Sequence, residues 1–570
     1  MNIPKTEYPR PSLVRDNWIN LNGQWQFEID HANTGMERKF WERETLSDKI
    51  LVPYAPESVL SGIGYTDFML AVWYRREFDL PAEPSDGRIL FHIDACDYRT
   101  VVFINGKKVG EHVGGYTPFA FDITDVAVRG GKNTVVVYAY DNTRDPLQPT
   151  GKQDNVYDNV HKCWYYTRTT GIWQTVWIEF VPDTYIEKIK LTPDVDNKKL
   201  RVRVSASKVV TDGTLSVRTS YKGKDTGSAE LKFDGRYAEF DLDITELHLW
   251  NPGAPEIYDI EFTLNSDRVK SYFAMRKVAI KGYAIEINDV PVFQRLVLDQ
   301  GYCGEGLYTA PSSDYYKREI EYALEAGFNG ARMHEKIFEP YYLYWADMLG
   351  YLLWGEYPNY HWNDSDPAAL DSMLPEWIEA VERDYNHPSI IGWCPGNEVT
   401  SYRIDRIYIF LYDVTRAIDP MRPIIDTSGW IHAKTDIYDS HDYTGDPVEF
   451  AKHYESLNTG VGDVYISYGW GKVPPVPYEG QPYFVSEFGA SAVNIENHEP
   501  TEEEFERFYK TFKEHVDILM DNKRMCAFCY CQWCDSAEHE CNGFITQDRR
   551  KKYDFARTRE IMGRKAEIEK

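Results

Sequence analysis

The C-terminal half of the chain, from about residue 281, alternates short apolar segments with helical patterns, and this alternation restricts the fold more than any other feature. Alternating strands and helices are typical of a parallel sheet, and eight such units in about 290 residues match a (β/α)8 barrel. An open, doubly wound sheet is the alternative, but polar residues at all eight ends favour closure. The eight candidate strands are 293–301, 330–335, 351–358, 390–398, 423–429, 436–443, 482–490 and 525–533.

Two segments between these strands carry clear helix signals. Residues 312–327 repeat apolar side chains at helical spacing and end at Gly327, a residue that commonly terminates helices. Residues 501–520 open with Thr501 and Glu504 at the spacing of a capping box. We expect both segments to be helices that pack against the sheet.

The first half of the chain consists of short strands between turn signals. The Asn105-Gly106 pair indicates a hairpin, because both residues tolerate positive φ. We expect a β-sandwich in residues 1–182 and an immunoglobulin-like β-sandwich of shorter alternating strands in residues 183–280. The chain is therefore predicted to be multidomain, with the barrel in residues 281–570.

The charge balance disfavours polyanionic partners. Lysine and arginine number 63 against 90 acidic residues, a net charge of −27, which repels nucleic acid and anionic membrane surfaces. The N-terminus lacks the apolar stretch of a secretory signal, and no run of about 18 apolar residues occurs. We expect a cytoplasmic protein without nucleic-acid or membrane partners. The sequence does not determine whether the chain forms a homo-oligomer.

Five of the nine cysteines fall within residues 525–541, which resembles a thiolate zinc site. If residues 525–533 form a strand, however, side chains alternate between its two faces. Cys526 and Cys534 would then point one way, and Cys529 and Cys531 the other. We therefore expect buried, reduced thiols in the eighth strand and no zinc ion.

Two carboxylates end strands on opposite sides of the predicted barrel. Glu398 follows the fourth strand and Glu487 lies in the seventh, so both would face the mouth, where barrel enzymes carry their sites. A protonated and an ionised carboxyl group are the pair that hydrolysis of an acetal requires. Metal binding and salt bridges are the alternatives for carboxylates at such a place.

Three segments resemble glycoside hydrolase family 2. IIGWCPGNEVT, residues 390–400, is similar to the family's acid/base segment, and PYFVSEFGA, residues 482–490, to its nucleophile segment. CWYYTRTTGIWQTVWIEF, residues 163–180, is similar to the signature that ends the family's N-terminal sugar-binding jelly-roll. The resemblance implies a jelly-roll domain, an immunoglobulin-like domain and a catalytic barrel, in that order.

The resemblance also implies a retaining mechanism in two steps. Glu487 matches the nucleophile and Glu398 the general acid/base, with carboxyl groups about 5 to 5.5 Å apart. The negative charge of Glu487 is expected to hold the proton on Glu398 until a glycosyl ester neutralises that charge. The product would keep the anomeric configuration of the substrate.

Further residues match positions that bind the sugar in this family. Asn397 would bind the 2-hydroxyl, Tyr443 would orient the nucleophile, and Trp533 would form a platform under the ring. Arg332 could instead act by holding Glu487 electrostatically, and His441 could be a structural hydrogen bonder. Asp299 departs from the family, which often carries Arg-His-Glu there; its carboxylate could bind sugar hydroxyls or could be a helix N-cap. The full set of expected substrate-binding residues is Asn397, Arg332, His334, Asp299, His441, Tyr443, Trp533 and, from the loop 151–155 of the jelly-roll, Asp154.

Departures from the family pattern bear on the sugar. The Asn-x-Lys that glucuronidases use to hold the sugar carboxylate is not found near CNGFITQDRRKK, residues 541–552. This disfavours a glucuronidase. Two segments, DQGYCGEGLYTAP (residues 299–311) and RMHEKIFEP (residues 332–340), resemble a β-galactosidase-like subgroup of the family. The resemblance implies an exo-acting enzyme for a β-galactoside, galactofuranoside or arabinoside, and a β-glucuronide or another sugar is the alternative. A non-catalytic carbohydrate-binding protein is the alternative from another class. No cofactor is expected; magnesium stays open, with Glu356 as a ligand that lacks an evident histidine partner.

Overall fold

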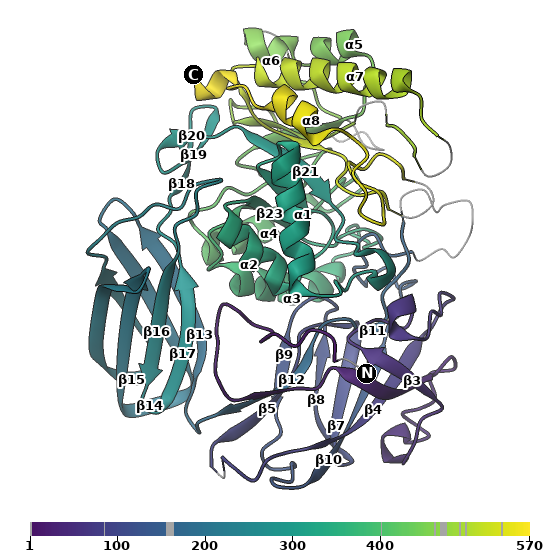
Figure 1. Cartoon of the computed structure of the whole chain (residues 1–570), viewed down its shortest axis with the longest axis vertical. Coiled ribbons are helices and arrows are strands. Elements are labelled where there is room, and N and C mark those ends of the chain that lie inside the picture. The colour runs from purple at the N-terminus through teal and green to yellow at the C-terminus, as the bar shows by residue number, and fades with distance from the viewer. Residues whose placement is uncertain are drawn as a thin grey trace.

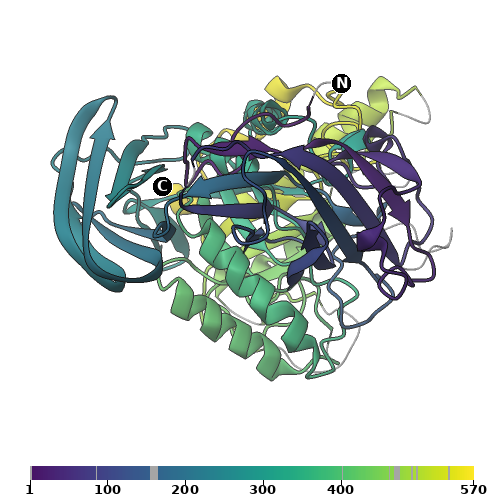
Figure 2. The same ribbon diagram turned by 90° about the horizontal axis from the view of Figure 1, so that it is seen from below.

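The computed structural model describes residues 3–84, 86–154, 165–400, 402–460, 463–467, 476–489, 492–495, 499–536 and 540–570. Two β-rich domains lie beside and below an α/β domain that is covered by helices (Figure 1). Seen from below, the second β domain stands apart on one side, while the first lies across the underside of the α/β domain (Figure 2). Within the described residues, no helix combines the length and apolarity needed to cross a membrane.

The N-terminal domain is a sandwich of a four-stranded sheet, in the order β1-β12-β5-β9, and a six-stranded sheet, in the order β3-β2-β4-β10-β7-β8. Its core is apolar and fully buried, with Trp25 and Phe91 among its members. The hairpin predicted at Asn105-Gly106 joins β7 to β8, and both residues have positive φ. The strands are β1 (Trp18–Asn20), β2 (Gly23–Ile29), β3 (Asp48–Val52), β4 (Ala71–Asp79), β5 (Arg88–Ile93), β6 (Cys96–Asp97), β7 (Arg99–Ile104), β8 (Lys107–Val113), β9 (Phe119–Asp122), β10 (Lys132–Tyr140), β11 (Gly171–Ile172) and β12 (Val176–Val181), with short 3-10 helices η1 (Phe40–Glu42) and η2 (Val59–Ser61).

The second domain is built around two long paired strands, β14 (Lys199–Tyr221) and β15 (Lys224–Asp243). The first part of β14 pairs with β13 (Ile186–Asp194), and its last part pairs with β16 (Tyr258–Leu264), which pairs with β17 (Asp267–Phe273). Irregularities in the β14–β15 register between residues 205 and 213 separate these two parts. Such bulges bend strands, so the two parts enclose an apolar core.

The third domain is the expected barrel. Seven parallel strands run in the order β24-β23-β22-β21-β27-β26-β25. The predicted fifth strand, residues 423–429, forms only isolated parallel bridges, through Ile424 to Trp393 and through Ser428 to Asn397. It nevertheless occupies the place between β24 and β25, because His441 N donates to the Gly429 carbonyl. The strands are β21 (Gln294–Asp299), β22 (Gly330–Met333), β23 (Leu352–Glu356), β24 (Ile390–Cys394), β25 (Tyr438–Asp442), β26 (Tyr483–Phe488) and β27 (Met525–Tyr530), and a small sheet of β18 (Val278–Lys281), β19 (Ala284–Ile287) and β20 (Val290–Pro291) precedes them.

Helices surround this barrel (Figure 1). The capping box of Thr501 and Glu504 is present at the start of α7, and Gly327 ends α1 with a φ of 107°. Both signals were read from the sequence, and both are confirmed. The helices are α1 (Ser313–Ala326), α2 (Pro340–Leu349), α3 (Ala369–Asp384), α4 (Asp405–Ile418), α5 (Pro447–His453), α6 (Glu455–Thr459), α7 (Glu502–Met520) and α8 (Phe555–Met562), with short 3-10 helices η3 (Gly304–Gly306) and η4 (Glu567–Glu569).

Buried polar contacts join the domains. Arg15 is 6% exposed and bridges Glu179 of the sandwich (3.0 Å) to Asp267 of the second domain (2.8 Å). On the barrel side, Glu376 of α3 accepts a hydrogen bond from the backbone N of Tyr116 at 2.8 Å. The sandwich is thus connected to both other domains by charged groups that water does not reach. The boundaries at residues 182 and 280 stay predictions.

Candidate active site

The structure brings Glu398, Glu487 and His441 together at the carboxyl ends of the barrel strands. Glu487 lies in β26, His441 in β25, and Glu398 follows β24. One oxygen of each glutamate and a ring nitrogen of His441 all lie within 4.8 Å of one another. Three strand ends of a parallel barrel therefore meet at one point, as the sequence predicted for the two carboxylates.

Glu487 is held on several sides. Arg332 Nη1 lies 3.2 Å from Glu487 Oε1, and the Tyr443 hydroxyl donates a hydrogen bond to Oε2. Glu487 is 4% exposed, whereas Tyr443 is 54% exposed and so stands at the edge of the site. The carboxylate has a fixed direction because both of its oxygens have partners.

A buried ion pair between Arg332 and Glu356 fixes the position of Arg332 beside Glu487. Arg332 also donates through Nε to Glu356, whose other oxygen lies 3.1 Å from His334 Nδ1. Burial alone would raise the pKa of Glu356, but Arg332 and His334 lower it to about 2. Burial lowers the pKa of His334, so the neutral ring donates its Nδ1 proton to Glu356.

Glu356 does not fit the magnesium ligand considered from the sequence. Both of its oxygens are engaged, and the Arg332 guanidinium beside it would repel a divalent cation. Within the described ranges, the group of Glu398, His441 and Glu487 is the one cluster of histidine, cysteine and acidic side chains with metal-like spacing.

Asn397 lies between Arg332 and Glu398. Its Oδ1 accepts a hydrogen bond from Arg332 Nη2 at 3.1 Å, and its backbone N donates to Asn359 Oδ1 at 2.7 Å. The buried Nδ2 has no hydrogen-bond partner among the described residues. Asn397 therefore has a fixed side-chain amide whose Nδ2 group is left to donate to a ligand.

The proton at this site lies elsewhere than the sequence led us to expect. His441 Nδ1 is 2.8 Å from Glu398 Oε1, and His441 Nε2 is 3.4 Å from Glu487 Oε1. Burial favours a neutral Glu398, but His441 and Lys152 lower its pKa to about 2, while Glu487 and Glu398 raise the pKa of His441. These shifts favour the proton on His441 over Glu398, the opposite of the sequence expectation.

Sequence reasoning missed two neighbours of Glu398. The Tyr360 hydroxyl donates a hydrogen bond to Glu398 Oε2. Lys152, in the same loop as the predicted Asp154, places its Nζ 4.4 Å from the centre of the Tyr360 ring. In the GKQDN segment, residues 151–155, only Asp154 was considered as a site residue. Lys152 in the same segment was the signal that could have identified this neighbour of Glu398.

Trp533 is a correction. It was expected to form a platform for the sugar, but it is 2% exposed and its indole N donates to Glu319 of α1 at 3.0 Å. Its ring packs near Phe328 and Phe555 in the layer between strands and helices. The strand β27 ends at Tyr530, so alternation could not be extended to residue 533.

The described hydrogen bonds of two further expected residues, Asp299 and Asp154, are made to other groups than the two carboxylates. Asp299 accepts hydrogen bonds from Gly301 N at 2.8 Å and from the Tyr342 hydroxyl at 3.0 Å, and its described hydrogen bonds do not include Glu398 or Glu487. Asp154 lies at the end of the described part of its loop, where its backbone N donates to the Tyr166 carbonyl at 2.8 Å. Contact of either residue with a sugar stays a prediction.

Cys526, Cys529 and Cys531 are buried, as expected, whereas Cys534 and Cys541 are half-buried, and Cys526 faces another way than expected. Cys526 joins Cys529 and Cys531 in the inner core of the barrel, because the pairing of β27 with β26 shifts register at residue 526. Cys534 lies with the outer layer. Burial raises the pKa of the Cys531 thiol, and the nearby Glu487 raises it further, so this thiol stays protonated beside the site.

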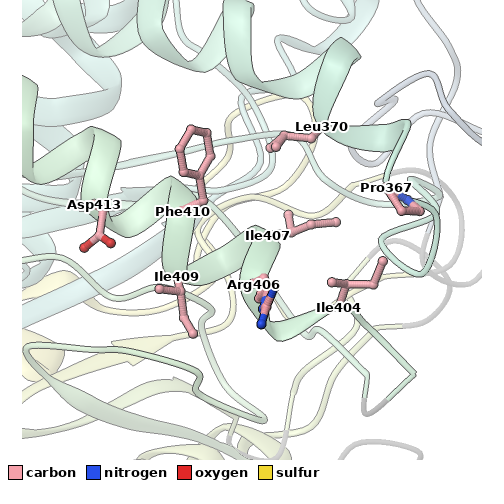
Figure 3. Close-up of a pocket in the computed structure, with 8 residues that line it drawn as sticks. All are labelled: Pro367, Leu370, Ile404, Arg406, Ile407, Ile409, Phe410 and Asp413. Atoms are coloured by element: carbon pink, nitrogen blue, oxygen red, sulfur yellow. The ribbon is translucent and has the colours of Figure 1, made fainter.

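An open apolar hollow of about 540 Å³ lies elsewhere, against the first turns of α4 (Figure 3). Ile407 and Phe410 of α4 and Leu370 of α3 contribute to its lining. It shares no residue with the carboxylate cluster, and none of the predicted site residues lines it.

Comparisons with known proteins agree with the order of the domains. Family models match "Glycosyl hydrolases family 2, sugar binding domain" over residues 19–178, "Glycosyl hydrolases family 2" over 184–276 and "Glycosyl hydrolases family 2, TIM barrel domain" over 343–562. A β-glucuronidase of Paenibacillus borealis is 25% identical over 73% of this chain and 74% of its own length. The β-glucuronidase of Rattus norvegicus is 24% identical over 91% of this chain and 84% of its own.

A β-galactosidase of Leuconostoc mesenteroides is also similar, at 24% identity over 73% of this chain and 40% of its own length. Among solved structures, a β-glucuronidase of Ruminococcus gnavus in complex with an N1-substituted uronic isofagomine superimposes with a TM-score of 0.80 at 19% identity, covering 98% of this chain and 99% of that one. A β-glucuronidase of Dictyoglomus thermophilum gives a TM-score of 0.78 at 20% identity, with 98% of each chain covered. These similarities show the same three-domain fold.

Proposed function

Because the chain belongs to glycoside hydrolase family 2, we propose that it is a retaining exo-glycosidase in which Glu487 is the nucleophile and Glu398 the general acid/base. The observation that carries this proposal is the spacing of the two glutamates, which have oxygens within 4.8 Å of each other. Retaining enzymes hold their carboxyl groups about 5 to 5.5 Å apart, whereas inverting enzymes leave about 6.5 to 9.5 Å for a water molecule.

In the first step, Glu487 attacks the anomeric carbon while the bond to the leaving oxygen breaks. The proton on His441 passes through Glu398 to that oxygen. Formation of the glycosyl ester removes the negative charge of Glu487, which is one of the groups that raise the pKa of His441. His441 therefore gives up its proton more readily as the ester forms.

In the second step, Glu398 takes a proton from the attacking water, and the water oxygen displaces Glu487 from the anomeric carbon. The proton returns to His441 as Glu487 regains its charge, so the starting state is restored. Arg332 and Tyr443 hold Glu487 in place throughout. The free Nδ2 of Asn397 is the donor for the sugar hydroxyl next to the reacting carbon.

For the sugar, we propose a terminal β-linked glucuronic acid. The β-glucuronidases among the relatives, two of which cover most of this chain, support this choice. The order of preference reached from the sequence, with a galactoside first, is thereby reversed.

A neutral β-galactoside or related sugar is the second candidate. It is favoured by residues 541–552, where the Asn-x-Lys of glucuronidases is not found, and by Glu540, which directly precedes this segment. The Glu540 carboxylate accepts hydrogen bonds from Tyr166 and Gln532 and would accept them equally from neutral hydroxyl groups.

Nitrophenyl β-glycosides test both parts of the proposal. The panel contains the glucuronide, glucoside, galactoside, galactofuranoside and arabinosides. Glu398→Gln should lower kcat/KM about 10² to 10⁴-fold on the preferred substrate, and Glu487→Gln should abolish turnover. Glu325→Gln, on an exposed helix surface, should leave turnover unchanged. An inverted product in an NMR time course would refute the mechanism, and a preferred neutral sugar would refute the glucuronide alone.

A further inference from the structure

A loop of the N-terminal sandwich, residues 150–153, is seated on the barrel beside the carboxylates. Thr150 Oγ1 lies 2.9 Å from His361 Nδ1, and Gly151 N donates to the Pro358 carbonyl at 3.2 Å. Gln153 is fully buried and ties the loop to its own domain, donating to Asp97 at 2.9 Å. Thr150, Gly151 and Gln153 therefore hold the loop in place through these hydrogen bonds.

The side chain of Lys152 takes no part in anchoring the loop, although its carbonyl accepts a hydrogen bond from Tyr166 N at 2.8 Å. Lys152 is 8% exposed, and its Nζ lies over the ring of Tyr360. The Tyr360 hydroxyl donates a hydrogen bond to Glu398. Within the described residues, no carboxylate oxygen lies within ion-pairing distance of this Nζ. A buried cation is normally paired, because removing it from water carries a large cost.

The surrounding charges keep Lys152 protonated without pairing with it. Burial would lower its pKa, but the carboxylates of Glu540, Glu398 and Glu487 raise it. Tyr166 and Gln532 both donate to Oε2 of Glu540, and the two oxygens of Glu398 are hydrogen-bonded to His441 and Tyr360. Lys152 therefore keeps its hydrogen-bond donors for a ligand that enters the site.

We propose that Lys152, a residue of the sandwich domain, binds the carboxylate of the terminal uronic acid. This proposal rests on the proposed function, since it assumes that the sugar beside Glu398 and Glu487 is a uronic acid. The Arg332 guanidinium cannot bind this carboxylate, because it already forms ion pairs with Glu356 and Glu487. Lys152 is another buried cation whose charge acts on both catalytic carboxylates.

The test compares two substrates that differ only at C6, nitrophenyl β-glucuronide and nitrophenyl β-glucoside. Lys152→Met removes the charge but keeps most of the side-chain volume. In this variant the ratio of the two kcat/KM values, glucuronide over glucoside, should fall about 10- to 100-fold, because a hydrogen bond to a charged group is lost. Lys152→Arg should restore most of the ratio. Lys336→Met, which removes another buried lysine that donates to the carbonyls of Gly301 and Tyr308, should leave the ratio unchanged.

Binding to the inactive Glu487→Gln variant provides a second measurement that does not depend on turnover. Calorimetry with D-glucuronic acid should show weaker binding when Lys152→Met is added, while the affinity for glucose changes less. Equal losses on both sugars would overturn the proposal and make Lys152 a positioning residue for Glu398. A wild-type enzyme that cleaves only neutral glycosides would overturn it through the choice of sugar, leaving the retaining mechanism intact.

Discussion

His441 Nδ1 lies 2.8 Å from Glu398 Oε1, so a histidine on β25 is hydrogen-bonded to the residue proposed as the general acid/base. The same ring reaches toward Glu487, with Nε2 at 3.4 Å from Oε1. Two carboxylates this close would repel each other if both were ionised. A proton on His441, whose pKa both carboxylates raise, offsets that repulsion.

Replacing His441 should change the pH profile as well as the rate. In the wild type, the proton for the leaving group is held by His441, whose pKa is raised by Glu487 and Glu398 despite burial. In His441→Gln, Glu398 is the only carrier, and a carboxyl group ordinarily titrates near pH 4.3. We expect the basic limb of kcat/KM to move to lower pH. His248→Gln, in the second domain, is the control, and an unmoved limb in His441→Gln would contradict the assignment.

Gly151 permits the close seating of its loop. Its φ is +58°, and a Cβ there would lie 2.4 Å from the Glu335 carbonyl oxygen. Gly151→Ala should therefore displace the loop and lower kcat/KM about tenfold or more, with about 1 to 3 kcal/mol of destabilisation. Gly223→Ala is a matched control, because Gly223 has φ +79° and open space around its Cβ position. Equal activities of the two variants would show that the seating of the loop does not matter.

His432 should contribute stability that depends on pH. It is 1% exposed between Asp426 (2.8 Å) and Asp439 (3.1 Å), and although burial opposes the charge, these carboxylates raise its pKa to about 10. Its contribution is therefore fully present below pH of about 6.5, the unfolded value, and is lost as the pH rises toward 10. His432→Asn should lower the free energy of unfolding by about 3 to 5 kcal/mol at pH 6, and by less at pH 9 to 10. The fall in Tm should be larger at pH 6 for the same reason.

The same Tm difference between wild type and His432→Asn at pH 6 and at pH 10 would exclude a charged His432. Differences between the two proteins are measured at each pH, so that other titrating groups cancel.

Arg15 should be needed for the junction of the two β domains. Arg15→Met leaves Asp267 and Glu179 buried with one cation fewer, which costs about 3 to 5 kcal/mol for a broken buried pair. Arg201→Met removes an exposed pair with Asp241, at 3.0 Å, and should cost less than about 1 kcal/mol. Thermal unfolding of both variants checks this, and similar Tm values would contradict the prediction.

Much of the fold could be read from the sequence because local patterns decide it. Seven of the predicted barrel strands are present, since buried parallel strands leave short apolar runs. Residues 423–429 form isolated bridges instead, although their apolar run looks like the others. The positions of Glu398 and Glu487 followed from strand ends, which a parallel barrel gathers on one side.

The failures arose where geometry depends on more than one element. Trp533 lies beyond the end of β27, and a register shift at residue 526 turns Cys526 inward, neither of which is visible in a pattern of alternating residues. Lys152 escaped notice because it reaches the carboxylates only through the docking of one domain on another. The proton on His441 likewise depends on a distance between strands that no local pattern contains.

The loop 150–153 makes domain docking and ligand affinity thermodynamically reciprocal. Lys152 acts on Glu398 from the sandwich, while Glu398 itself belongs to the barrel. A ligand that touches both domains binds more weakly whenever their contact is loosened, and by linkage the bound ligand must tighten that contact by the same factor. Substitutions at a distant face of the sandwich can therefore alter the apparent affinity for a sugar without touching a catalytic residue.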